Sequence, residues 1–483
     1  MNVLFVSSEV APLVKTGGLA DISGALPAAL RGLGHDCRIL MPGYRGLMER
    51  LHVERRRPAA TLLTHRGRVH VMQGLMPDSE LPVYFIDAPE LYDRDGGPYA
   101  DARGSEWPDS AQRFALLGDV AAVLAGPRSP LDWPLDILHL NDWQTGLAAA
   151  YLRQQSGVTA RCVFTIHNLA FQGNFDKMVL PELGLPWDLF TPEGLEFYDR
   201  ISFMKAGLVW SDHITTVSPT YAREIQTPEH GCGLDGLLRQ RAADLSGILN
   251  GVDTHYWNPA TDRHLQFRYD VGSLHLKVMN KIALQHELGL EADDNIPLLG
   301  VVSRLTHQKG LDLLADLLPS LLAEGVQCAV LGSGESALEA RFAELARSWP
   351  RQCALGAGYN EPLAHRIEAG ADIFVMPSRY EPCGLNQMYS MRYGTPPVVR
   401  RTGGLADTVT PVALTSLLER TATGFLFGPP TAEALMGELQ RALARWRQPK
   451  VWRQIQENGM ARDFSWAASA ALYVNLYKTL LSD

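Results

Sequence analysis

The sequence predicts an α/β protein of two doubly wound lobes, each a parallel sheet covered by helices. Short apolar runs alternate with helix-length segments along almost all of the 483 residues, as in parallel strands joined by crossover helices. The runs are continuously apolar, which suits strands buried on both faces. A chain of this length also exceeds what one hydrophobic core serves, so two lobes are expected.

The expected elements fall into two sets. In the first half, helix-length segments such as residues 19–33 and 110–125 separate the strand candidates at residues 3–8, 37–41, 83–86, 137–141, 163–167 and 213–217. The second half restarts the rhythm with strand candidates at residues 298–303, 328–331, 373–377 and 397–400, and ends in amphipathic helices over residues 434–481. The turn-forming Asn250-Gly251, followed by a polar stretch over residues 253–270, places the boundary between residues 250 and 251.

Composition excludes several classes of protein. A formal net charge of −9 argues against a general nucleic-acid binder, which needs a basic surface. The six cysteines include no CxxC pair, so neither a disulfide framework nor a structural zinc site is expected. We see no signal peptide and no apolar stretch of membrane-spanning length, and therefore expect a cytoplasmic protein without a membrane partner. Whether the chain forms a homo-oligomer is left open.

Ligands of doubly wound folds bind beyond the carboxyl ends of the strands, in the cleft that two lobes leave between them. After the first strand comes Lys15-Thr16-Gly17-Gly18-Leu19, where glycines allow close approach and the next helix offers N–H groups to an anion; a plain tight turn is the alternative. After the first strand of the second lobe, Arg304 and Lys309 flank one loop. A guanidinium and an ammonium together suit a diphosphate leaving group, although two exposed cations on a loop are the alternative.

Two further strand ends carry polar residues. Glu381 lies in Ser378-Arg379-Tyr380-Glu381-Pro382-Cys383-Gly384-Leu385-Asn386, where a carboxylate can accept hydrogen bonds from sugar hydroxyls or can simply cap a helix. His167 ends a first-lobe strand whose neighbour ends in Asn141-Asp142-Trp143. A histidine there could stabilise a carbocation-like sugar through its ring or its carbonyl, but a satisfied hydrogen-bonding histidine is the commoner case.

Four motifs in order carry a resemblance to a known family. KTGGL, SRLTHQKG, RYEPCGLNQ and RRTGGLADTV occur here as in glycogen and starch synthases, and the chain closely resembles the bacterial glycogen synthases that use ADP-glucose, from residue 3 to about residue 465. The resemblance implies the GT-B fold of two Rossmann-like lobes, with a C-terminal helix over residues 457–483 crossing back to the first lobe. It implies transfer of glucose to the non-reducing 4-hydroxyl of an α-1,4-glucan, with retention at the anomeric carbon.

The resemblance also assigns residues. On the catalytic side it places His167 beside the anomeric carbon, Glu381 at the glucose, and Arg304 and Lys309 on the diphosphate. The substrate-binding residues that it implies are Lys15, Gly18, Asp21, Asp142, Asn250, Tyr359 (on the adenine), Cys383, Gly384 and Leu385.

Two departures from the family stand out. The family commonly has His-Asp-Trp-His where this chain has Asn141-Asp142-Trp143-Gln144, so no histidine acts at 141 or 144. Many retaining GT-B enzymes carry two glutamates eight apart, whereas Glu381 is followed by Tyr389. With no pair of carboxylates of the kind that retaining glycosidases hold, we expect no covalent glycosyl-enzyme.

No cofactor and no metal are expected, because the DxD sequence Asp93-Arg94-Asp95 lies in a Gly/Pro-rich turn. The alternatives are a pyridoxal-phosphate phosphorylase, a non-catalytic glucan-binding relative, and a UDP-glucose, sucrose or trehalose-type synthase. The choice between ADP- and UDP-glucose rests on the resemblance alone.

Overall fold

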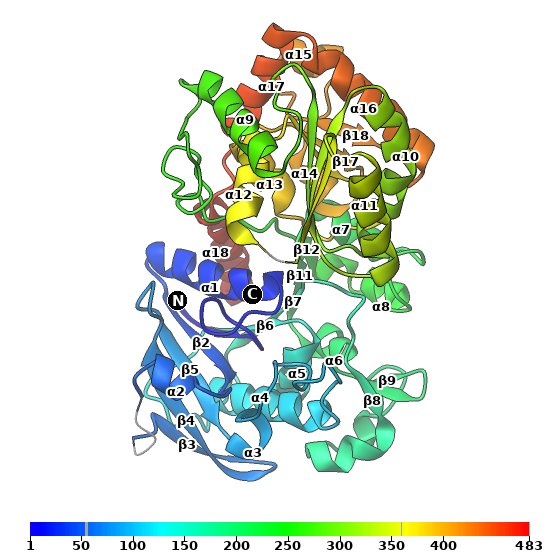
Figure 1. Ribbon diagram of the computed structural model, residues 1–483. Helices are drawn as coiled ribbons and strands as arrows, with labels where there is room; N and C mark the ends of the chain where they lie inside the picture. The colour runs from blue at the N-terminus through cyan, green and yellow to red at the C-terminus, as the bar shows by residue number, and fades with distance from the viewer. Residues whose placement is uncertain (54–56, 359, 483) are drawn as a thin grey trace. The chain divides into compact units, whose positions relative to one another are not determined.

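The computed structural model describes residues 1–53, 57–358 and 360–482. The chain divides into two compact units (Figure 1). Unit 1 combines Met1–Gly251 with Trp466–Asp483, and unit 2 is Val252–Ser465. Each unit is described by itself below.

Unit 1 is built on a nine-stranded sheet of order β12-β11-β7-β6-β1-β2-β5-β4-β3. The strands from β12 to β5 run parallel, whereas β4 is antiparallel to both β5 and β3. The strands are β1 (Asn2–Val6), β2 (Asp36–Pro42), β3 (Ala60–Thr64), β4 (Gly67–Leu75), β5 (Pro82–Asp87), β6 (Ile137–Asn141), β7 (Arg161–Ile166), β11 (His213–Thr216) and β12 (Leu245–Gly247). A small antiparallel sheet holds β8 (Asn174–Asp176), β10 (Arg200–Ser202) and β9 (Glu196–Phe197).

The helices of unit 1 cover both faces of its sheet. They are α1 (Gly18–Gly32), α2 (Leu47–Arg50), α3 (Pro89–Tyr92), α4 (Ser110–Ala125), α5 (Trp143–Arg153), α6 (Phe203–Trp210), α7 (Pro219–Glu224), α8 (Asp235–Gln240) and the C-terminal α18 (Trp466–Ser482). On one face, Leu26 of α1 and Tyr473 and Tyr477 of α18 are buried against Phe5 of β1. The C-terminal helix therefore shares the hydrophobic core of the N-terminal strands (Figure 1).

Unit 2 is built on an entirely parallel six-stranded sheet of order β15-β14-β13-β16-β17-β18. Its strands are β13 (Leu298–Val302), β14 (Gln327–Gly332), β15 (Cys353–Ala357), β16 (Ile373–Met376), β17 (Pro397–Arg400) and β18 (Phe425–Phe427). Its helices are α9 (Lys277–Glu287), α10 (Leu311–Ala323), α11 (Ser336–Ser348), α12 (Glu361–Gly370), α13 (Asn386–Arg392), α14 (Gly403–Thr408), α15 (Leu414–Leu418), α16 (Ala432–Trp446) and α17 (Pro449–Met460).

The continuous apolar runs of unit 2 have a direct structural reason. In β13, Leu299 and Val301 belong to the core that also contains leucines of α10 and α16. Leu298, which points to the other face, belongs to the core formed with Leu284 of α9 and Ile367 of α12. Both faces of the strand are buried, so both sets of alternating residues are apolar.

Both sheets place a switch point beside the first strand of their unit. In unit 2 the strand order is 3-2-1-4-5-6 in the order of the chain, and the order reverses between β13 and β16. In unit 1 it reverses between β1 and β6. The loops that follow these four strands are therefore where a ligand of a doubly wound sheet is expected.

The C-terminal segment differs from its predicted bounds. We expected the return to the first lobe to begin at residue 457, but residues 457–460 belong to α17, whose Trp452 and Ile455 join the core of unit 2. Unit 1 resumes only at Trp466. The predicted boundary near Asn250-Gly251 lies beside the division after Gly251.

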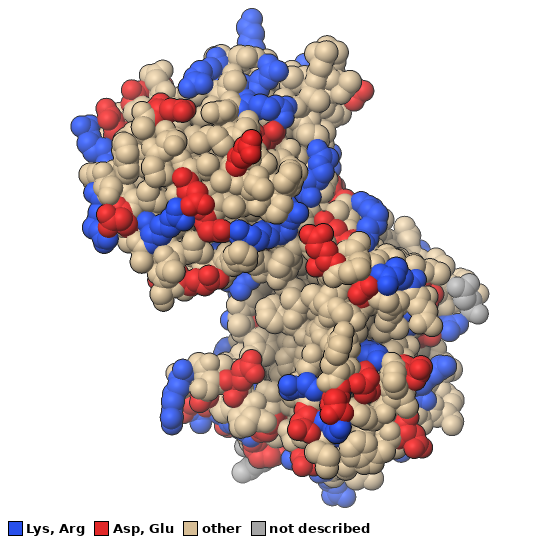
Figure 2. Space-filling view, turned by 90° about the vertical axis from the view of Figure 1, so that its right-hand side faces the viewer, with Lys and Arg blue, Asp and Glu red and all other residues tan. Residues whose placement is uncertain are grey.

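Among the described residues, no helix combines the length and the apolar character that crossing a membrane requires. On the face drawn in Figure 2, basic and acidic side chains are interspersed over both units.

Candidate functional site

At the switch point of unit 2, the loops after β13 and β16 meet. Lys309 lies in the loop after β13, and its Nζ is 2.6 Å from Oε2 of Glu381, in the loop after β16. Their side chains are only 17% and 8% exposed, so both charges are largely removed from water. Ser378 also donates a hydrogen bond to Oε2 of Glu381, at 3.0 Å. The structure thus pairs two of the predicted catalytic residues, whereas Arg304 of the same loop is exposed.

Glycines bring the supporting loops close to the predicted sugar-side residues. Gly403 of the TGG segment has φ 42°, and a Cβ there would lie 1.9 Å from the carbonyl oxygen of Glu381. Glycine is thus required twice over, by the left-handed backbone and by the close contact. Cys383 is buried, and Gly384 and Leu385 continue the same loop into α13. The motif RRTGGLADTV therefore forms the support beneath the Glu381 loop.

A clamp that the sequence motifs did not indicate joins the two loops. Arg379 donates to both carboxylate oxygens of Asp312, at 2.6 Å each, and to the carbonyl oxygen of His307 at 2.7 Å. Its backbone N–H also donates to the carbonyl oxygen of Gln308 at 2.8 Å. The Arg379 hydrogen bonds hold the pKa of Asp312 below its usual value. Because Lys309 lies between His307 and Asp312, the bidentate pair of Arg379 and Asp312 fixes the loop that carries Lys309.

In unit 1, the loop after β1 closes around a buried carboxylate, Glu9. This carboxylate accepts hydrogen bonds from the backbone N–H groups of Thr16 (2.5 Å) and Gly17 (3.1 Å) and from the hydroxyl of Tyr99 (3.0 Å). Burial raises the pKa of Glu9, whereas these hydrogen bonds lower it. The sequence gives only a weak indication that Glu9 is a site residue, because a single glutamate after a strand can serve many structural roles.

The KTGGL segment presents an ion pair and open backbone. Lys15 and Asp21, both predicted to bind substrate, form an ion pair of 2.7 Å between partly exposed side chains. A Cβ built on Gly17 or Gly18 would meet no atom of the described residues within 4 Å, and neither glycine has a positive φ. Neither close packing nor a left-handed backbone therefore explains why these two residues are glycines.

Asp142 and His167 meet at the ends of β6 and β7. Oδ1 of Asp142 accepts the backbone N–H of His167 at 2.8 Å and that of Asn168 at 3.4 Å. Burial raises the pKa of Asp142 to about 7, although these two hydrogen bonds act in the opposite direction. Asp142 also has φ 57° with ψ −179°, a strained conformation for a residue with a side chain. Strain of this kind concentrates at functional sites.

The imidazole of His167 is neutral and held from one side. Its Nε2 lies 2.9 Å from Oδ1 of Asn141, and burial lowers the pKa of His167 to about 3. Its Nδ1 is buried and has no hydrogen-bond partner among the described residues. The same is true of Oδ1 of Asn250, which follows β12, and of Oε1 of Gln144 in α5. Three buried acceptors without partners in the described part of the chain thus follow strands of one sheet.

The remaining predictions fall in different places. Tyr359, expected on the adenine, lies outside the described residues. Tyr389, at the position of the missing second glutamate, stacks on Trp257 with ring centroids 3.9 Å apart. Asp93 and Asp95 of the DxD sequence both pair with Arg45. In the described ranges, no group of three or more His, Cys, Asp or Glu side chains is arranged to hold a metal ion.

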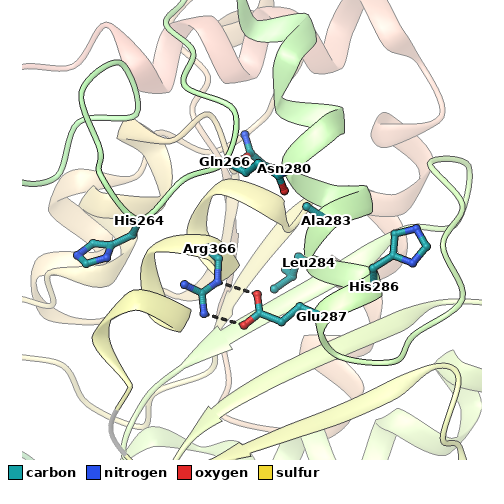
Figure 3. Close-up of a pocket in the computed structure, with 8 residues that line it drawn as sticks. All are labelled: His264, Gln266, Asn280, Ala283, Leu284, His286, Glu287 and Arg366. Carbon is teal, nitrogen blue, oxygen red and sulfur yellow. Dashed lines mark hydrogen bonds and ion pairs between the residues drawn. The ribbon is translucent and has the colours of Figure 1, made fainter.

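A hollow of about 440 Å³ lies on unit 2. It is lined by α9, α12 and the segment around His264, and Figure 3 shows the ion pair of Glu287 and Arg366 among its lining residues. The guanidinium and the carboxylate make two hydrogen bonds, of 2.6 and 2.7 Å. None of the predicted site residues lines this hollow.

Comparisons with known proteins match the whole chain. Residues 2–240 match the family described as starch synthase catalytic domain, and residues 287–459 match glycosyl transferases group 1. The chain is 49% identical to a glycogen synthase of Nitrosomonas eutropha, over 100% of this chain and 96% of that protein. It is 51% identical to a glycogen synthase of Dechloromonas aromatica, over 100% and 99%.

Solved structures agree with the fold. The catalytic domain of starch synthase IV from Arabidopsis thaliana, bound to ADP and acarbose, matches with a TM-score of 0.87 and 33% identity, over 100% of this chain and 99% of that one. A sucrose-phosphate synthase from Thermosynechococcus elongatus matches with a TM-score of 0.61 at 18% identity, which bears on the fold alone. The expected GT-B class, with two Rossmann-like domains, is confirmed.

Proposed function

Because the chain belongs to the glycogen synthase family of glycosyltransferases, we propose that it transfers glucose from ADP-glucose to the non-reducing 4-hydroxyl of an α-1,4-glucan, with retention of configuration. The observation that carries this proposal is the buried pair of Lys309 and Glu381 at the switch point of unit 2. A cation and a carboxylate held side by side suit a ligand with a diphosphate at one end and sugar hydroxyls at the other. The ADP bound to the similar starch synthase IV supports adenine as the base.

The unit 2 residues act on the leaving group. Arg304 and Lys309 neutralise the charge that develops on the diphosphate as the bond from the anomeric carbon to the phosphate oxygen breaks. Lys309 is paired with Glu381, so the donor competes for its ammonium. Glu381 then accepts hydrogen bonds from glucose hydroxyls, beside Cys383, Gly384 and Leu385.

The unit 1 residues act on the sugar and on the acceptor. The open backbone at Gly18 admits the donor closely, and Lys15 and Asp21 exchange their exposed ion pair for contacts with substrate. His167 lies beside the anomeric carbon as a neutral ring, since burial lowers its pKa to about 3. Asp142 holds the backbone of His167, and Asn250 offers its buried amide oxygen to a hydroxyl.

Retention follows without a covalent intermediate in this scheme. Glu381 accepts hydrogen bonds from the Ser378 hydroxyl and, in this scheme, from glucose hydroxyls, which makes its carboxylate a poor nucleophile. The acceptor hydroxyl instead adds to the face from which the diphosphate departs, and its proton passes to the departing phosphate oxygen. Trapping a glucosyl group on Glu381 would refute this scheme.

The experiment that tests the proposal measures incorporation of labelled glucose into glycogen from ADP-glucose and, in parallel, from UDP-glucose, each with and without EDTA. We expect incorporation that depends on ADP-glucose and is unaffected by EDTA. Incorporation from UDP-glucose alone would overturn the choice of donor. Incorporation from neither would favour a non-catalytic glucan-binding protein.

A further inference from the structure

Asn141 links two strands through its side-chain amide at the end of β6. The residue is 1% exposed. Its Nδ2 donates to the carbonyl oxygen of Val6 in β1 at 3.0 Å, and its Oδ1 faces Nε2 of His167 at 2.9 Å. A carbonyl oxygen can only accept, so the amide nitrogen must face Val6 and the amide oxygen must face the imidazole. The orientation of the amide is therefore determined by the hydrogen bonds themselves.

This orientation determines the tautomer of His167. Since Oδ1 of Asn141 can only accept, Nε2 of the ring must carry the proton. A neutral imidazole has one proton, which leaves Nδ1 with a bare lone pair. Burial lowers the pKa of His167 to about 3, so the ring takes up no second proton near neutral pH.

The titratable groups around the ring are occupied elsewhere. Oδ1 of Asp142 accepts backbone N–H groups, including that of His167, and the charge of Glu9 contributes to the raised pKa of Asp142. His139 is held at 2.6 Å by both the Tyr477 and Thr165 hydroxyls, and burial lowers its pKa to about 3 as well. Within the described residues, none of these groups forms an ion pair with the ring of His167.

The bare Nδ1 is a built acceptor without a partner. It is buried and forms no hydrogen bond within the described chain. A buried acceptor left unpaired costs about 1–3 kcal/mol, so such a group calls for an explanation. A ligand hydroxyl that donates to Nδ1 would supply one.

We propose that Asn141 is a positioning residue, which holds His167 in the Nε2–H tautomer so that Nδ1 accepts a hydrogen bond from a hydroxyl of the bound sugar. The identity of the ligand rests on the proposed function, whereas the tautomer does not. The proposal also accounts for the departure from the family pattern at this position. A neutral histidine at 141 offers one N–H and one bare nitrogen, which is the same donor and acceptor pair that the amide supplies.

The tautomer is tested directly in the unaltered chain. We would record long-range nitrogen–proton correlations of the protein labelled with 15N-histidine, and assign His167 by the signal lost in His167→Gln. The expected spectrum shows a protonated Nε2 and a bare Nδ1, unchanged between pH 6 and pH 8.5. A ring protonated at Nδ1, or one that titrates in this range, overturns the inference even if glucose transfer is normal.

The positioning role is tested by a double-mutant cycle on transfer rates. Asn141→Leu should lower kcat/KM for the donor by about tenfold, the loss of one hydrogen bond to the sugar, and by less than about twofold in a His167→Ala background. Asn141→His should retain most of the wild-type rate. An equal loss in both backgrounds would mean that Asn141 acts only on stability, and would overturn the inference.

Two controls separate the possible failures. Thermal unfolding of each variant shows whether the protein folds, and if Asn141→Leu does not, the spectrum of the unaltered chain still decides the tautomer. If the unaltered chain transfers no glucose, the proposed function fails while the spectrum still tests the tautomer. If it transfers glucose and Asn141→Leu matches the wild type, only the inference on Asn141 fails.

Discussion

Replacing Lys309 by methionine removes a cation from a buried pair while keeping the length of the side chain. The partner, Glu381, is 8% exposed on its side chain and lies 2.6 Å from the ammonium. The variant therefore leaves a buried carboxylate whose remaining donor, among the described residues, is the Ser378 hydroxyl. Breaking such a pair from one side costs about 3–5 kcal/mol, and the remaining hydroxyl places Lys309→Met near 3 kcal/mol. For a unit of this size, that lowers Tm by about 10 °C.

The double variant separates stability from activity. Adding Glu381→Gln removes the stranded charge and should return the protein to within about 1 kcal/mol of wild type, as replacement of whole buried pairs commonly does. Transfer should not recover, because removing one group that stabilises developing charge costs about 10²–10³ in kcat. Denaturant unfolding and initial rates of glucose transfer measure the two effects.

The matched control is the surface pair on α9 and α12. Arg366 and Glu287 are paired at 2.6 Å but are 29% and 39% exposed, so Arg366→Met should change stability by less than about 1 kcal/mol and leave transfer unchanged. If Lys309→Met is as stable as this control, or if the double variant is as unstable as the sum of the single ones, the pair is not a coupled buried ion pair.

Three further predictions concern the loops around the site. Gly18→Ala should leave stability unchanged, because the added Cβ meets no atom of the described residues, but should lower kcat/KM for the donor about tenfold or more. The control, Gly32→Ala, is equally open at the end of α1 and should leave transfer unchanged. Equal rates for both variants would contradict this use of Gly18. Arg379→Met should lower kcat by loosening the Lys309 loop. Because Arg379 depresses the pKa of Asp312, its contribution to stability is present above about pH 4 and is lost as the pH falls through the folded-state pKa, so stability curves that stay parallel down to pH 2 would refute it. Burial raises the pKa of Asp142 to about 7. As the pH rises from about 4 to 7, Asp142 ionises in the unfolded chain but not in the folded protein, so the free energy of unfolding of the wild type falls. Asp142→Asn should therefore gain a few kcal/mol of stability over wild type across that range while losing transfer, and a gain independent of pH would contradict the raised pKa.

The sequence predicted the frame of the fold because unit 2 buries both faces of its strands. The apolar runs around residues 298–303, 328–331, 373–377 and 397–400 correspond to β13, β14, β16 and β17. β15 and β18 were missed. β15 has half-exposed positions at Ala354, Leu355 and Gly356, and β18 has only three residues, so neither forms a long apolar run.

The candidate site was predictable where one loop carries its own chemistry. Lys309 and Glu381 each follow a buried strand, and the parallel sheet brings those strand ends together. Glu9 and the Arg379–Asp312 clamp were missed because their partners are backbone groups or lie 67 residues away along the chain. The link from Asn141 to His167 crosses from one strand to the next, and spacing in the sequence does not reveal it.

The measurement that tests the central claim most directly follows the position and linkage of the transferred glucose. We would incubate the unaltered chain with ADP-glucose labelled in the sugar and with glycogen, and then digest the product with β-amylase, which cuts α-1,4 linkages from non-reducing ends. The predicted result is release of the label as maltose, with Lys309→Met incorporating at least about 10²-fold less. Absence of incorporation, or label that β-amylase does not release, would contradict the proposed transfer.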